Sequence, residues 1–92
     1  MSQFDWDPEK AEANVRRNGI SFEEADAAIS SPLALEVPDT IHSDTDPRVR
    51  VTAWSPTGHL LTVIVSVARP PGRIISARRA TKRERHAYES HA

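Results

Sequence analysis

The sequence contains no cysteine, so neither a disulfide framework nor a zinc site built on thiolates can form. Its longest apolar stretch, residues 60–68, is interrupted by Thr62 and Ser66 and is far too short to span a bilayer. The first residues lack a basic flank followed by an apolar run, which argues against a signal peptide. These absences predict a cytoplasmic protein with no membrane contact.

No internal repeat, low-complexity tract or long linker divides the chain. A length of 92 residues therefore predicts one small domain, residues 1–92. A domain of this size buries only roughly 60–65% of the surface that its unfolded chain exposes. We expect marginal stability, which a bound partner would raise through mass action.

The net charge of −1 conceals an uneven distribution. Residues 1–68 contain 5 Lys or Arg against 11 Asp or Glu, whereas residues 69–92 contain 7 against 2. A basic C-terminal quarter joined to an acidic body is typical of a surface that attracts phosphates. A solvated, arginine-rich helix would give the same composition, so both interpretations stay open at this point.

Capping and turn signals predict the order of the helices and strands. Helices are expected over residues 8–17, 22–29 and 82–90, because Asp7, Ser21 and Thr81 each fit a capping position. Strands are expected over residues 33–37, 48–54, 59–68 and 73–78. Pro38 restricts the first of these to an edge or broken strand. Residues 4–6 form an aromatic lead-in that fits a further edge strand.

This order predicts an α+β domain, with two N-terminal helices, an antiparallel β-meander of three to four strands and a C-terminal helix. Both faces of the strand over residues 59–68 are largely apolar, which indicates a central position. In the last strand, Arg73 and Arg78 are five residues apart. Ideal alternation places them on opposite faces unless a bulge re-aims one of them.

Five segments, in this order, resemble the BrnT toxins of bacterial type II toxin–antitoxin systems. They are Phe4-Asp5-Trp6-Asp7 followed by Lys10 and Asn14; residues 19–25 (GISFEEA); Asp39 followed by His42-Ser43; Arg48 or Arg50; and residues 73–81 (RIISARRAT) followed by Glu84-Arg85 and Tyr88. The last segment is the most specific, because two spaced arginines, a serine and a capping box recur at fixed offsets.

The chain departs from the family pattern at three places. Arg17-Asn18-Gly19 stands where family members usually carry Lys-His-Gly, which removes an acid–base group at that position. Ala53-Trp54 stands where a glycine is common, and Asp46 where a glutamate is frequent.

The resemblance implies a RelE-like fold and a ribonuclease activity that inhibits translation. It also implies a hetero-oligomer with a BrnA-type antitoxin that carries a ribbon-helix-helix domain. The chain would then contact DNA only indirectly, through an antitoxin complex that represses its own operon. No cofactor is implied.

Metal-independent RNA cleavage needs a base for the 2′-OH, positive charge at the phosphorane and an acid for the leaving 5′-oxygen. Because the arginine fork matches phosphate geometry and stays charged, Arg78 is the candidate for transition-state charge and Arg73 for phosphate positioning. Tyr88 is a candidate acid or stacking platform, His42 a candidate acid–base group and Lys10 a candidate base.

Five further side chains are candidates for RNA binding: Arg48, Arg50, Arg79, Lys82 and Trp54. Each candidate also fits a plain structural role, such as a solvated arginine, lysine or loop histidine or a packed aromatic residue. His42 lies near Asp44 and Asp46 but has no second histidine close to it, so no metal site is expected.

The leading interpretation is therefore a metal-independent endoribonuclease. A binding module of the same fold that complexes an antitoxin or RNA without catalysis is the alternative. A small DNA-binding protein is the third class; against it, the last helix follows a strand directly and lacks a helix-turn-helix partner.

Overall fold

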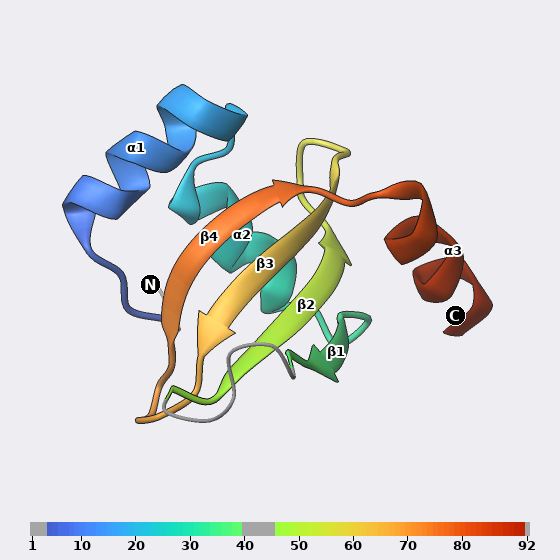
Figure 1. Cartoon of the computed structure of the whole chain (residues 1–92). Helices are drawn as coiled ribbons and strands as arrows, with labels where there is room; N and C mark the ends of the chain where they lie inside the picture. Colours follow the sequence, from blue (N-terminus) through green and yellow to red (C-terminus); the bar gives the residue numbers. More distant parts are fainter. Residues whose placement is uncertain (1–3, 40–45, 92) are drawn as a thin grey trace.

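The structure, a computed structural model, describes residues 4–39 and 46–91. The elements in these ranges are α1 (Pro8–Asn18), α2 (Phe22–Ile29), β1 (Leu35–Pro38), β2 (Arg48–Trp54), β3 (Leu60–Ser66), β4 (Arg73–Arg79) and α3 (Lys82–His91). The strands form one antiparallel sheet in the order β1-β2-β3-β4 (Figure 1). The α+β class, the meander and the positions of the three helices are confirmed.

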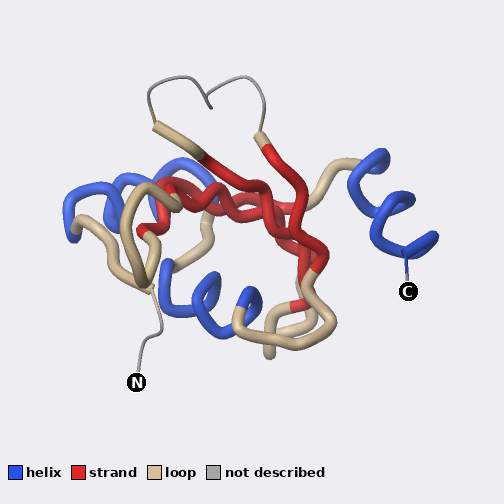
Figure 2. The backbone as a smooth tube through the Cα atoms, turned by 90° about the horizontal axis from the view of Figure 1, so that it is seen from below, coloured by secondary structure: helices blue, strands red, loops and turns tan. Residues whose placement is uncertain are grey.

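The three helices occupy different sides of the sheet. Figure 2 shows α2 against one face, with α1 and α3 at opposite ends of the molecule. α2 contacts β2, β3 and β4, whereas α1 contacts β4 and α3 contacts β2. No helix in the described part of the chain is long and apolar enough to cross a bilayer.

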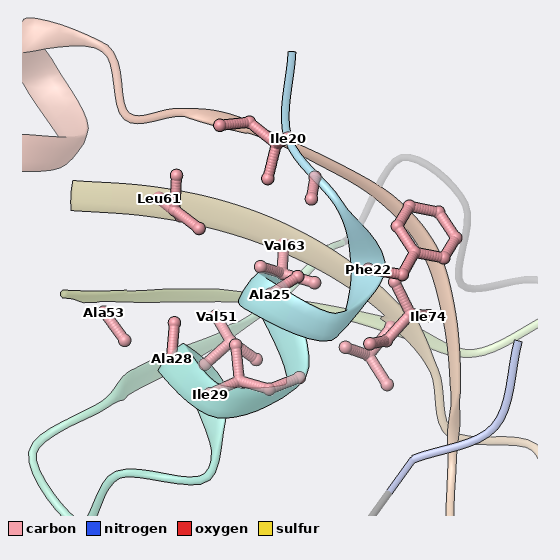
Figure 3. Packing of buried hydrophobic residues seen from close by; sticks show 12 residues of the cluster. Ile20, Phe22, Ala25, Ala28, Ile29, Val51, Ala53, Leu61, Val63 and Ile74 are labelled. Carbon is pink, nitrogen blue, oxygen red and sulfur yellow. The ribbon is translucent and has the colours of Figure 1, made fainter. Parts of the chain in front are cut away.

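The core lies between α2 and the sheet (Figure 3). Phe22, Ala25 and Ile29 are buried on one side of α2, as their helical spacing predicts. They pack with alternate residues of the strands, because successive strand residues point to opposite faces. The other members of this cluster are Ile20, Ala28, Val51, Ala53, Leu61, Val63, Val65, Ile74 and Ala77.

Two strands begin later than the sequence predicts. Residues 33–34 belong to a turn, in which Ala34 N donates to the Ser31 carbonyl at 3.2 Å, so β1 begins at Leu35. The turn between β2 and β3 extends to residue 59 because Ser55 N donates to the His59 carbonyl at 2.8 Å. β3 therefore covers residues 60–66, and its central position is confirmed.

The N-terminal lead-in joins the sheet through one residue. Asp5 forms an isolated parallel bridge with Arg73, and its N and O atoms bond to residues 72 and 74. Trp6 then packs against the core, with its ring edge-on to Phe22 at a centroid distance of 6.1 Å. The lead-in thus covers one end of β4.

Asn14 of α1 covers another part of the same edge. Its Nδ2 donates to the Ala77 and Ile20 carbonyls, both at 2.8 Å, and its Oδ1 accepts from Ala77 N at 3.1 Å. Asn18 Nδ2 also donates to the Ala77 carbonyl, at 3.0 Å. These bonds satisfy backbone groups of an edge strand that would otherwise lack partners.

β4 contains one extra residue relative to β3. Ser76 lies opposite Ile64, but Ile74 lies opposite Val65, so the register gives Ile75 no partner in β3. This is a β-bulge, which shifts the alternation of side chains by one residue. On one side of Ile75, the side chains of β4 therefore point to the opposite faces from those that strict alternation predicts.

The bulge brings Arg73 and Arg78 to the same face of the sheet. Arg78 lies opposite Thr62 and Arg73 opposite Ser66, and directly opposed residues in antiparallel strands point the same way. Ideal alternation would separate the two arginines, and the bulge that the prediction named as the exception brings them together. Both lie on the face away from the core, which we call the polar face; it also carries Arg48, Arg50, Thr52, Trp54, Thr62 and Ser66.

Candidate active site

The polar face carries a cluster centred on Glu84 of α3. Glu84 Oε1 accepts a hydrogen bond from Arg78 NH1 at 2.7 Å, and its Oε2 accepts one from Arg78 NH2 at 3.0 Å. Thr62 Oγ1 donates to Oε1 at 3.0 Å, and Arg50 NH1 lies 3.6 Å from Oε2. Arginines from two strands therefore converge on one anionic group. We call these residues, Glu84, Arg78, Arg50 and Thr62, the Glu84 cluster.

A capping box positions Glu84 over the sheet. Glu84 N donates to Thr81 Oγ1 at 3.1 Å, and Thr81 N donates to Glu84 Oε1 at 2.9 Å. The predicted capping box at the start of the last helix is confirmed. Because Thr81 follows β4 almost directly, the first turn of α3 places its carboxylate within reach of Arg78.

Glu84 is strongly stabilised in its ionised form. The hydrogen bonds from Arg78 lower its pKa to about 2, and those from Thr81 and Thr62 contribute further. Its side chain is only 13% exposed. A carboxylate with so low a pKa is a weak base, so Glu84 does not fit the role of general base. The guanidinium groups of Arg78 and Arg50 instead form a binding position for a planar anionic group, which the Glu84 carboxylate occupies.

Arg50 has bonding capacity left over at this binding position. Its Nε is buried and has no hydrogen-bond partner within residues 4–39 and 46–91. Buried donors are nearly always paired in folded proteins, so this guanidinium nitrogen is a donor that only a rearrangement of the Glu84 cluster could satisfy. An apolar groove of about 230 Å³ adjoins it, lined by Leu35, Val37, Arg50, Thr52, Arg83, Glu84 and Ala87.

The two candidate aromatic residues differ in exposure. Trp54 is 43% exposed, and Arg85 Cζ lies 5.2 Å from its ring centroid, as in a cation–π contact. Tyr88 lies one helical turn after Glu84 and is only 8% exposed. In this conformation Tyr88 packs, whereas Trp54 offers a ring face beside cationic groups.

Two of the arginines predicted to bind RNA or position phosphate lie on the polar face but away from the Glu84 cluster. Arg73 NH2 is bonded to Asp5 Oδ2 at 3.1 Å, and Arg48 Nε to Asp46 Oδ2, also at 3.1 Å. Both lie level with Ser66, four residues along β3 from Thr62. Each therefore has its own carboxylate partner at the opposite end of the sheet.

The remaining candidates lie elsewhere. Lys10 is exposed on α1, and the structure does not bring it to the described Glu84 cluster. Arg79 and Lys82 are exposed where β4 leads into α3. His42 lies outside the described residues. In the part that the structure describes, no group of three His, Cys, Asp or Glu side chains is placed to hold a metal ion.

A second polar cluster surrounds the turn between β2 and β3. Glu24 Oε2 lies 3.0 Å from His59 Nδ1 and also accepts a hydrogen bond from Thr57 Oγ1. His59 Nε2 lies 3.3 Å from Arg79 NH2. The hydrogen bond from Thr57, aided by Ser55 and His59, holds the pKa of Glu24 below its ordinary value.

A family model described as "Ribonuclease toxin, BrnT, of type II toxin-antitoxin system" matches residues 6–84. The chain belongs to the BrnT family. The match covers the sheet, α1, α2 and the start of α3, including Glu84 and all the arginines of the polar face. A search of curated proteins gave no match.

The structure explains one departure from the BrnT pattern. Asn18, at the position where the family usually carries histidine, donates to Asn14 Oδ1 at 3.1 Å as well as to the Ala77 carbonyl. Its side chain therefore ties α1 to β4. No acid–base group stands at this position.

Two features of the sites were missed from the sequence. Glu84 was expected only as a cap, although a carboxylate six residues after Arg78 could have suggested an ion pair. His59 had no supporting pattern because its partner Glu24 is 35 residues away. Ser21 and Glu24 predict a capping box, of which only one half forms: Glu24 N donates to Ser21 Oγ at 3.0 Å, but the Glu24 side chain turns to His59 instead.

Proposed function

We propose that this BrnT family member is a metal-independent endoribonuclease that cleaves RNA by attack of a 2′-OH on the adjacent phosphate. The observation that carries the proposal is the convergence of Arg78 and Arg50 on one anionic group. The two NH···O bonds from Arg78 to a carboxylate have the fork geometry that arginine also uses with phosphate. An RNA phosphate fits the same binding position.

The chemistry asked of these residues is electrostatic. Attack of the 2′-oxygen on phosphorus adds charge to the phosphate oxygens, and preorganised cations stabilise that charge by roughly 2–4 kcal/mol for a single well-placed donor. Arg78 is assigned this role, with Arg50 beside it. Trp54, exposed on the same face, is assigned to stack on a neighbouring base.

RNA must displace Glu84 from Arg78 for this to happen. The carboxylate occupies both terminal nitrogens of Arg78 and is joined to the chain by the first turn of α3. A shift of the first turn of α3 would free Arg78; α3 lies against β2 and is held to β3 and β4 by the bonds of Glu84 itself. Glu84 then acts as an internal competitor of RNA.

The proposed partner is an antitoxin of the ribbon-helix-helix type, similar to BrnA, in a hetero-oligomer that binds DNA through the antitoxin. Membership in a toxin–antitoxin family supports an antitoxin partner in general. Because the proposed action on RNA inhibits translation, we expect the protein in the cytoplasm. A short neighbouring reading frame with a ribbon-helix-helix pattern would support the specific partner.

The test is cleavage of a labelled single-stranded RNA by the purified chain in the presence of EDTA. We expect products with 2′,3′-cyclic phosphate ends and no cleavage where a 2′-deoxy nucleotide precedes the scissile bond. Arg78→Ala should reduce cleavage by about 10²-fold or more, whereas Arg16→Ala, an exposed arginine of α1, should not. An Arg78→Ala variant that cleaves like the parent chain would refute the assignment.

The occupied binding position also favours a second function. If α3 never releases Arg78, the chain is a binding module that complexes an antitoxin or RNA without cleaving it. Absence of cleavage by the wild type and by Glu84→Gln, with RNA binding retained, would favour this function.

A further inference from the structure

Glu24, His59 and Arg79 come from three separate elements and form a continuous row of contacts. Glu24 lies in the first turn of α2, His59 in the turn between β2 and β3, and Arg79 at the end of β4. The two ring nitrogens of His59 contact the two charged partners at 3.0 and 3.3 Å. The imidazole therefore lies between a carboxylate and a guanidinium.

The partners determine which ring nitrogen carries the proton. Glu24 has a lowered pKa and is an acceptor, so His59 Nδ1 donates to it. Arg79 can only donate, so His59 Nε2 accepts from it through its lone pair. This assignment makes Nε2 the unprotonated ring nitrogen, and the carboxylate behind Nδ1 fixes the orientation of the ring. Arg79 must turn from Nε2 to the phosphate before Nε2 can take a proton.

The row is accessible to a large ligand. The His59 side chain is 34% exposed and Arg79 is exposed, whereas Glu24 is only 16% exposed behind them. Arg79 has no ion pair with a carboxylate among the described residues, whereas Arg48, Arg73 and Arg78 each have one. A phosphate can therefore bind Arg79 without displacing an acidic side chain.

We propose that Glu24, His59 and Arg79 form the acid–base unit of this ribonuclease, with His59 as general base and Arg79 bound to the scissile phosphate of single-stranded RNA. This inference rests on the function proposed above and names the base that it left open. Glu24 is a positioning residue, because it acts on the substrate through His59. Arg78 points to the other face of the sheet, so in this inference it holds a neighbouring phosphate, and the stabilisation of transition-state charge assigned to Arg78 above passes to Arg79.

Cleavage at this site transfers one proton and exchanges one phosphorus–oxygen bond for another. His59 Nε2 takes the proton of the 2′-OH while the 2′-oxygen forms a bond to phosphorus. The bond from phosphorus to the 5′-oxygen breaks, and the 5′-oxygen leaves with the bonding pair and takes a proton from solvent water. The imidazolium then returns its proton to the hydroxide so formed, and the products are a 2′,3′-cyclic phosphate and a 5′-hydroxyl.

This mechanism predicts the sign of the pH dependence. The base must be neutral, so kcat/KM should rise with pH and reach a plateau as the ring loses its proton. The charged groups in contact with the ring within residues 4–39 and 46–91 are Glu24 from α2 and Arg79 from β4. Removing His59 should remove that rising limb.

The experiment measures kcat/KM for a single-stranded RNA oligonucleotide as a function of pH in the full chain. We expect His59→Ala to lose about 10²–10⁴-fold and to flatten the profile, with partial rescue by added imidazole, which only a folded site can show. His86→Ala, which removes an exposed histidine of α3, is the matched control and should behave as wild type. Glu24→Gln should lose less than His59→Ala and shift the rising limb.

The outcomes separate this inference from the function on which it rests. A wild-type chain that cleaves no RNA overturns both. A wild-type chain that cleaves, together with His59→Ala and His59→Gln variants that keep the rate and the rising limb, overturns the role of His59 alone.

Discussion

Arg78 and Glu84 are six residues apart and are joined through both terminal nitrogens of the guanidinium, at 2.7 and 3.0 Å. The strand supplies the cation and the helix that follows supplies the anion, with one capping residue between them. The pair thus closes the polar face of the sheet by a contact that is local in sequence. Its strength determines how readily another anion reaches Arg78.

Replacing Glu84 by Gln should strengthen RNA binding. The substitution keeps the size of the side chain but frees Arg78 and Arg50 from a competing charge, so we expect about tenfold tighter binding of a 2′-O-methyl RNA, which cannot be cleaved. Glu89→Gln removes the same charge from an exposed position of α3 and is the control. Equal effects of the two substitutions would show that net charge alone is responsible.

The same pair should make stability depend on pH in the acid range. The pKa of Glu84 is about 2 in the folded chain against an ordinary value of 4.5, so its contribution is present above pH 4.5 and is lost as pH falls toward 2. After allowance for solvent screening, we expect Glu84→Gln to cost about 2 kcal/mol at pH 7 and little at pH 2. Urea unfolding of both chains across this range measures the difference, and a cost that is independent of pH would contradict the prediction.

Asn14→Ala should destabilise the fold more than any substitution on the surface of α1. It removes four hydrogen bonds of a buried side chain and leaves Ala77 N without its acceptor, at a cost of about 2–4 kcal/mol. Asn18→Ala, which removes two hydrogen bonds at an exposed position, should cost clearly less. Denaturant unfolding measures both, and equal losses would show that the edge of β4 does not depend on Asn14.

Arg50→Ala should weaken binding of 2′-O-methyl RNA and lower its salt dependence. Loss of one phosphate contact reduces the slope of log affinity against log salt by about 1. Arg17→Ala, exposed on α1, changes the net charge equally and should leave the slope unchanged. A slope unchanged in the Arg50 variant would place the RNA elsewhere on the molecule.

The alternation of β2 and β3 and the starts of all three helices could be predicted because local signals determine them. Val49 and Val51 alternate with Arg48 and Arg50, and each helix has a capping side chain ahead of it. The faces to which the β4 side chains point could not be predicted, because Ile75 is neither the glycine nor the proline that often marks a bulge.

The candidate sites were predictable only in part, for a different reason. Arg78 was singled out from its neighbours in sequence, and its partner Glu84 is also local. The pairing of Glu24 with His59 depends on how α2 lies across the sheet, and no local spacing encodes that distance. Side chains that meet through tertiary packing carry no periodic signal.

The location of Glu84 in the first turn of α3, close behind β4, affects which anions can reach Arg78. A carboxylate tethered so near Arg78 acts at an effective concentration of at least about millimolar, which dilution of the protein cannot reduce. Free phosphate or short oligonucleotides at micromolar levels would then fail to displace Glu84 from Arg78. Long RNA, which engages several guanidinium groups at once, would overcome the tether, so chain length of the nucleic acid rather than its concentration would set the threshold for engagement.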